Sequence, residues 1–281
     1  MKIRHHSHIF IYIAVILLAS FGCAPKKVLI AKDKESGAYY KFGLAYLNEN
    51  PPKTHQAYVE FIKAVEADPQ NKDAYHALGH LYFLRQEYAK AIDAFQKALR
   101  IDPNFSEASN YLGKSLELSG RDEEAIIAYQ GAANNLQYET PQLPHWNLAL
   151  LYKKQKRYEM ALSELADVRR VEPNNSIVLH EIGDTYIKMG TPALARPFYE
   201  EATKISPNDH RAYYLLASFY LQEGLSLEAS EAFQKVIELS PESEEAEESR
   251  KKLSVMKGDS YLPSPFWGIA PIRGSRIRQL A

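Results

Sequence analysis

The fold is decided by one stretch of sequence, residues 75–103, which reads YHALGHLYFLRQEYAKAIDAFQKALRIDP. Its first half carries aromatic, apolar and small residues at the three- and four-residue spacing of one helix face, namely Tyr75, Leu78, Gly79 and Tyr82. Its second half repeats that spacing with Ala91, Phe95 and Ala98, and the pattern ends at Pro103. Residues 75–103 therefore predict two amphipathic helices that pack against each other.

The same pattern recurs along most of the chain. Its closing proline returns with separations of 34, 70, 34 and 34 residues, at Pro69, Pro103, Pro173, Pro207 and Pro241. The separation of 70 is two periods of 34 with two residues added. Read backward from each proline, the pattern gives six copies, which is typical of a repeat protein.

This repeat resembles the tetratricopeptide repeat (TPR), a helix–turn–helix unit of 34 residues. The resemblance implies an all-α fold, a right-handed TPR superhelix of six TPR helix pairs plus a capping helix. Gly79, Gly113 and Gly183 are expected to let the first helix of a pair approach the second, which offers alanines such as Ala91 and Ala125. Aromatic side chains are expected between successive pairs, which accounts for the 19 tyrosines.

Composition and motifs limit the function. Lys and Arg total 34 against 35 Asp and Glu, and this formal net charge of −1 argues against nucleic acid as the main ligand. The single cysteine excludes a disulfide or a cysteine-based metal site within one chain. No GxSxG, P-loop or dinucleotide-binding motif occurs, and the repeats leave no span for an enzyme domain. We therefore expect no enzyme activity, no cofactor and no metal, since His76 and His80 lack a third metal ligand.

The N-terminus has the features of an export signal. Two basic residues precede an apolar run, residues 9–19, that is shorter than a membrane span of ~20 residues, and the only cysteine, Cys23, follows Gly22. This order resembles a bacterial lipoprotein signal, although residues 20–21 depart from its usual box. The resemblance implies a signal peptide at residues 1–22 and acyl chains on Cys23. The alternative is ordinary cleavage, which leaves Cys23 as a free thiol on a soluble exported protein.

The remaining segments follow from the repeats. A solvated tether is predicted at residues 23–35, the repeats at 36–241, a polar capping helix at 242–257, and a tail rich in proline, aromatic residues and arginine at 258–281. An elongated loop is predicted at residues 134–144, where the two-residue insertion lies. Thr191 and Pro192 are expected at the start of a helix that Pro197 kinks.

Binding is expected on the concave face that the first helices of the copies build. Its residues fall one and five places after the first aromatic position of each copy, and Phe83 lies one turn further along its helix. The predicted protein-binding groove comprises Tyr40, Leu44, His76, His80, Phe83, Asn110, Lys114, Trp146, Leu150, His180, Asp184 and Tyr214. Trp146 is the strongest candidate anchor, because tryptophan is enriched among the residues that dominate binding. The alternative is that Trp146 packs against the loop at residues 137–144.

An exported lipoprotein of six TPRs resembles the type IV pilus biogenesis and stability proteins, the PilF/PilW/Tgl-type pilotins. The likeness covers residues 23–241, and residues 120–125 (GRDEEA) and 136–141 (LQYETP) carry its more specific part. It implies a non-enzymatic protein, anchored in the outer membrane and facing the periplasm, that helps a pilus secretin subunit to reach that membrane and to form multimers. The alternatives are a lipoprotein of the outer-membrane β-barrel assembly machinery, a general periplasmic scaffold, or an accessory subunit of an enzyme.

Overall fold

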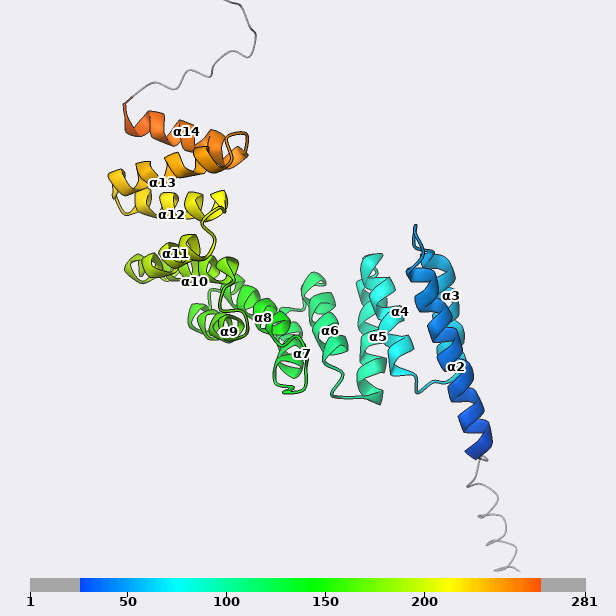
Figure 1. The fold of residues 1–281 in the computed structure, drawn as a ribbon. Helices are drawn as coiled ribbons and strands as arrows, with labels where there is room; N and C mark the ends of the chain where they lie inside the picture. Colours follow the sequence, from blue (N-terminus) through cyan, green and yellow to red (C-terminus); the bar gives the residue numbers. More distant parts are fainter. Residues whose placement is uncertain (1–25, 259–281) are drawn as a thin grey trace, which may run out of the picture. The chain divides into compact units, whose positions relative to one another are not determined.

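A computed structural model of the chain describes residues 26–258, and within this range it contains thirteen α-helices and no strand (Figure 1). Successive helices pack as helix–turn–helix pairs, which confirms the all-α TPR fold. The chain divides into two compact units, one ending at Pro173 and the other beginning at Asn174. None of the described helices is both long and apolar enough to cross a membrane.

The first unit holds four helix pairs. Its helices are α2 (Lys26–Leu47), α3 (Thr54–Ala67), α4 (Lys72–Leu84), α5 (Tyr88–Ile101), α6 (Ser106–Leu118), α7 (Asp122–Ala133), α8 (Gln142–Lys154) and α9 (Tyr158–Val171). The second unit holds two pairs and one further helix. Its helices are α10 (Ser176–Lys188), α11 (Pro192–Ile205), α12 (His210–Gln222), α13 (Ser226–Leu239) and α14 (Glu244–Met256).

Four of the six described pairs are closed by a ring that lies against a glycine of the first helix. A Cβ atom on Gly79 would lie 2.6 Å from the ring of Phe95, and a Cβ atom on Gly113 would lie 2.6 Å from the ring of Tyr129. The atoms nearest to such a Cβ atom belong to this ring and not to an alanine such as Ala91. The ring lies one turn further along the second helix, and it fills the space that a side chain would need.

The first helix is longer than the sequence indicated. Helix α2 begins at Lys26, so the described part of the predicted tether is helical. No proline interrupts residues 26–47, and a helix that is anchored by packing can extend through such a segment. Packing begins at Ser36, which is fully buried and donates a hydrogen bond to the Ala64 carbonyl oxygen over 2.8 Å.

Two further segments refine the predicted turns. The loop after α7 ends at Pro141, and the buried Pro144 lies in the first turn of α8, where its missing N–H has no partner to lose. Pro192 occupies the first turn of α11 as expected, but the Thr191 side chain does not cap that helix. Pro197 lies inside α11 on its exposed side, and the helix continues beyond it to Ile205.

Helix α14 closes the second unit. It packs on α13 and α12, and its buried residues are Ala246, Ser249 and Leu253. The Ser243 side chain accepts a hydrogen bond from the Ala246 N–H and so caps the helix. The predicted signal peptide, Cys23 and the tail beyond residue 258 lie outside the described residues.

Candidate functional site

In the first unit, three predicted groove residues converge on one ring of the next repeat. His76, His80 and Phe83 of α4 lie 6.0, 5.0 and 5.7 Å from the ring of Tyr111 on α6, measured between ring centroids. Phe95 stacks on the same ring at 5.9 Å. Sequence reasoning did not assign Tyr111 to this face, although an aromatic residue at that position sets this repeat apart from the others. Part of the predicted groove is therefore packing between repeats.

The two histidines of this ring cluster are uncharged at neutral pH. Burial, reinforced by the neighbouring His80, lowers the pKa of His76 to about 4. Burial also lowers the pKa of His80. The buried Nε2 atom of His76 has no hydrogen-bond partner among the described residues, so a proton added there would create an unpaired charge.

The third repeat contributes two polar residues that are already engaged. Asn110 is buried, and its Oδ1 atom accepts a hydrogen bond from Asn147 over 3.0 Å. The Lys114 ammonium lies 3.1 Å from Glu117, whose carboxylate also accepts a 2.8 Å hydrogen bond from Tyr129. Burial raises the pKa of Tyr129, so its hydroxyl stays protonated and keeps donating. Neither polar residue is a free clamp for a ligand carboxylate.

Tyr40, Leu44, Trp146 and Leu150 complete this face in the first unit. The Tyr40 ring lies 5.8 Å from the ring of Phe61, and Leu44 is 37% exposed. Trp146 and Leu150 are half-buried on α8. The described side chains around the central core cluster of this unit include Phe83 but neither Trp146 nor Leu150. These two α8 residues, like Leu44, keep part of their surface accessible to a partner.

In the second unit, the three predicted residues are also engaged. His180 is 9% exposed, and burial lowers its pKa. Asp184 accepts a hydrogen bond from Lys188 over 2.8 Å. The Tyr214 hydroxyl donates to Glu248 of α14, and burial raises the pKa of Tyr214 to about 12. Tyr214 therefore joins α12 to the closing helix.

Hollows occur elsewhere on the first unit. One, of about 400 Å³, lies between α3, α4 and α5 and is lined by residues that include Ile62, Tyr75 and Lys97. Another, of about 350 Å³, lies between α5, α6 and α7 and is lined by residues that include Leu99 and Ile127. The predicted groove residues line neither of these hollows. The sequence did not indicate these hollows, because they form where neighbouring helix pairs pack and no spacing of residues marks them.

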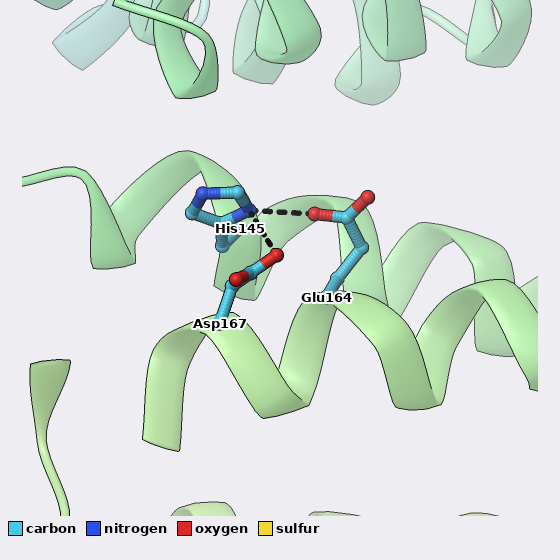
Figure 2. A group of neighbouring side chains, drawn as sticks. All are labelled: His145, Glu164 and Asp167. Carbon is cyan, nitrogen blue, oxygen red and sulfur yellow. Dashed lines mark hydrogen bonds and ion pairs between the residues drawn. The ribbon is translucent and has the colours of Figure 1, made fainter. Parts of the chain in front are cut away.

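One group of side chains has the composition of a metal site, although the sequence indicated none. His145, Glu164 and Asp167 place their potential ligand atoms within 4.8 Å of one another (Figure 2). These residues come from both helices of the fourth pair, with His145 on α8 and the two carboxylates on α9.

Comparison with known proteins supports the TPR assignment. A family model described as the cilia and flagella-associated protein 70 C-terminal domain matches residues 38–253. The type IV pilus assembly protein PilF of Pseudomonas aeruginosa is 29% identical over 176 residues, which are 63% of this chain and 69% of PilF. Superkiller protein 3 of Schizosaccharomyces pombe is 23% identical over 201 residues, 68% of this chain but only 14% of that protein.

Two solved structures of pilus biogenesis proteins are also similar. The structure of Pseudomonas aeruginosa PilF is 26% identical with a TM-score of 0.62, and the match covers 79% of this chain and 99% of that one. The structure of PilW, a type IV pilus biogenesis factor, is 21% identical with a TM-score of 0.61, covering 76% of this chain and 97% of that one. The likeness to PilW shows a shared fold.

Proposed function

This chain belongs to the TPR family described as the cilia and flagella-associated protein 70 C-terminal domain, and we propose that it is a non-enzymatic scaffold that binds a protein partner during type IV pilus assembly. The observation that carries this proposal is the likeness to PilF, which extends over 99% of the solved PilF chain. The partner proposed is a pilus secretin subunit, which the scaffold helps to reach the outer membrane and to form multimers.

The proposed contact is the α8 part of the first-helix face. Trp146 and Leu150 lie four residues apart on one helix, so they face the same side, and both retain exposed surface. Because these residues lie on a packed helix, their surface is already ordered before the partner binds. Little conformational entropy is therefore lost on this side of the complex. Trp146 would then act as the buried aromatic anchor of the complex.

Membrane attachment through Cys23 is the second part of the proposal. One acyl chain binds a membrane only marginally, with a constant on the order of 10⁴ M⁻¹, whereas several chains on one cysteine hold a protein firmly. The proposed location is the periplasmic side of the outer membrane. Cys23→Ala is expected to release the protein from membranes, and a fatty-acid analogue should label the wild type only.

The functional test uses a bacterium that makes type IV pili and lacks its own PilF. The full-length chain is expected to restore heat- and detergent-resistant secretin multimers and surface pili. Trp146→Ala should weaken binding to the secretin by about 2 kcal/mol or more, which is over an order of magnitude in affinity. Leu227→Ala is the matched control, because Leu227 is 71% exposed on α13 and belongs to a second helix.

The possible failures are distinct. Normal multimers in a folded, membrane-bound Trp146→Ala, Leu150→Ala double variant would show that the α8 face is not the contact. A wild-type chain that reaches the outer membrane and binds no secretin would reject the secretin as partner. Unlabelled wild type with unchanged membrane attachment in Cys23→Ala would reject acylation.

A further inference from the structure

The fourth helix pair carries a compact cluster of three metal-ligating side chains. The Nδ1 atom of His145 lies 2.6 Å from Oε2 of Glu164 and 3.9 Å from Oδ2 of Asp167. Figure 2 shows the imidazole of α8 directed at the two carboxylates, which leave α9 one turn apart. The side chains of His145 and Glu164 are 15% and 19% exposed, whereas Asp167 is 37% exposed. The cluster is therefore shielded on one side and open to solvent on the other.

The first three pairs show contacts at the same positions, which are therefore neighbours as a property of the repeat. In the first pair the Lys63 ammonium lies 5.6 Å from the centroid of the Tyr39 ring, and in the second the Lys97 ammonium lies 5.8 Å from that of the Tyr75 ring. In the third pair Ser109 at the same position donates a 2.7 Å hydrogen bond to a carbonyl oxygen of α7. The equivalent triplets are Tyr39, Glu60 and Lys63; Tyr75, Ala94 and Lys97; Ser109, Ala128 and Gly131; Leu179, Phe198 and Glu201; and Tyr213, Ala232 and Lys235.

Among the six described pairs, only the fourth fills all three positions with metal-ligating groups. At the position of Glu164, three other pairs place a buried alanine: Ala94, Ala128 and Ala232. A carboxylate at that position loses hydration, which a bound cation would compensate. The three metal-ligating residues also occur together, at a single contact between two helices. We propose that His145, Glu164 and Asp167 bind a divalent transition-metal ion such as Zn²⁺, which ties α8 to α9.

The ligand set decides the class of ion. Imidazole nitrogen is a ligand for zinc and its transition-metal neighbours, whereas Mg²⁺ and Ca²⁺ prefer oxygen ligands alone. Two carboxylates balance the charge of a divalent ion, and a neutral imidazole adds none. The open side leaves room for water in the remaining coordination position. Arg170 competes for the ion's place, because its guanidinium lies 2.8 Å from Asp167.

The experiment titrates Zn²⁺ into the full-length chain and measures the heat of binding. His5, His6 and His8 are replaced by serine in every variant, because these sequence neighbours also offer imidazole ligands. One Zn²⁺ per chain is expected, with a rise of about 5 °C in melting temperature at a hundredfold excess over Kd. Visible absorption of the Co²⁺-loaded protein should show the nitrogen and oxygen ligands.

His145→Gln and Glu164→Gln should each weaken Zn²⁺ binding at least about tenfold, on the scale seen when support of a metal ligand is lost. Arg170→Gln should strengthen Zn²⁺ binding, because this change removes a cation that competes for Asp167. The Arg170 side chain is 75% exposed, so the change should leave the fold intact. The matched control is His210→Gln. The Nε2 atom of His210 lies 3.4 Å from Glu245 of the second unit, and Arg211 binds the same carboxylate, so the affinity should not change.

The proposal has clear ways to fail. Absence of Zn²⁺ binding by the parent protein would show that the cluster is only a contact between polar side chains. Equal Zn²⁺ affinity in the parent, His145→Gln and Arg170→Gln proteins would place any bound metal elsewhere. A loss of affinity confined to the His210→Gln control would have the same meaning. These outcomes do not bear on the pilus scaffold, which requires no metal.

Discussion

At the scale of single residues, the contact between a glycine and a ring holds each of several helix pairs together. Gly43, Gly113 and Gly183 lie against Phe61, Tyr129 and Tyr199 in the same way that Gly79 lies against Phe95. Side-chain volume at such a position must displace a ring that has no free space around it. The glycines of the repeat are therefore packing residues, and their backbone freedom is secondary.

Gly113→Ala should destabilise the protein by about 1–3 kcal/mol, because its Cβ atom would lie 2.6 Å from the Tyr129 ring. The control is Gly37→Ala in α2, where no heavy atom lies within 4 Å of the added Cβ atom. That change should stabilise α2 by up to ~1 kcal/mol, since alanine favours the helix. Urea unfolding measures the free energy of unfolding of both variants. If the two changes had the same sign, the contact between Gly113 and the Tyr129 ring would not explain the effect.

Burial of His76 should make the stability of the protein depend on pH. An unfolded histidine titrates near pH 6.5, whereas burial holds the pKa of folded His76 at about 4. Between these values the unfolded chain binds a proton that the folded chain does not, so stability is full above pH 6.5 and falls as the pH is lowered toward 4. The loss should reach up to about 3 kcal/mol.

Urea unfolding at pH 7.5 and pH 5 measures this loss. His76→Phe should reduce the difference between the two pH values, because phenylalanine fills the ring cluster without titrating. His55→Phe is the control, since His55 is exposed on α3. An undiminished pH dependence in His76→Phe would assign it to other groups, of which His80 is the nearest with a lowered pKa.

At the scale of elements, Asn71 joins three helices. Its Oδ1 atom caps α4 by accepting a hydrogen bond from Ala74 over 2.9 Å, and its Nδ2 atom donates to Ser36 of α2 over 2.8 Å. Ser36 in turn donates to Ala64 at the end of α3. This chain of hydrogen bonds explains why α2 is packed from Ser36 onward.

Asn71→Ala should cost about 1–2 kcal/mol, because it removes the cap and a donor to a buried hydroxyl. Asn71→Asp keeps the capping oxygen and loses only the donor, so its cost should be smaller. Urea unfolding compares the two variants. Equal losses would mean that the contact with Ser36, and not the cap, carries the effect.

At the scale of the whole molecule, stability is expected to be local to each unit, because a repeat contacts mainly its neighbours. Leu253→Asp places a charge in the buried contact between α14 and the core of the second unit. It should cost more than about 2 kcal/mol there. Val255→Asp on the same helix is the control, since Val255 is 72% exposed.

Hydrogen exchange followed by mass spectrometry locates the damage. Protection should fall across α12 and α13 in Leu253→Asp and stay unchanged in α4 to α7. Uniform loss of protection along the described chain would show that the two units unfold as one cooperative body.

The sequence by itself determined the repeat, its helix pairs and the closing helix. A period of 34 residues and a helical spacing of apolar side chains are local properties of the chain, and they also single out Gly113 as a packing position. The sequence did not show that α2 begins as early as Lys26, because the charged residues among 26–35 indicated a solvated tether.

Only the tertiary structure decided which side chains of the first-helix face stay accessible. Helical spacing places His76, His180 and Trp146 alike, but burial depends on what the neighbouring helix presents, and Tyr111 covers His76. The cluster at His145 was missed for the same reason, because it depends on a contact between two helices. Its partner Glu164 lies 19 residues away on the second helix of the pair. No motif spacing encodes such a contact, because the rotation and crossing of two packed helices bring its atoms together.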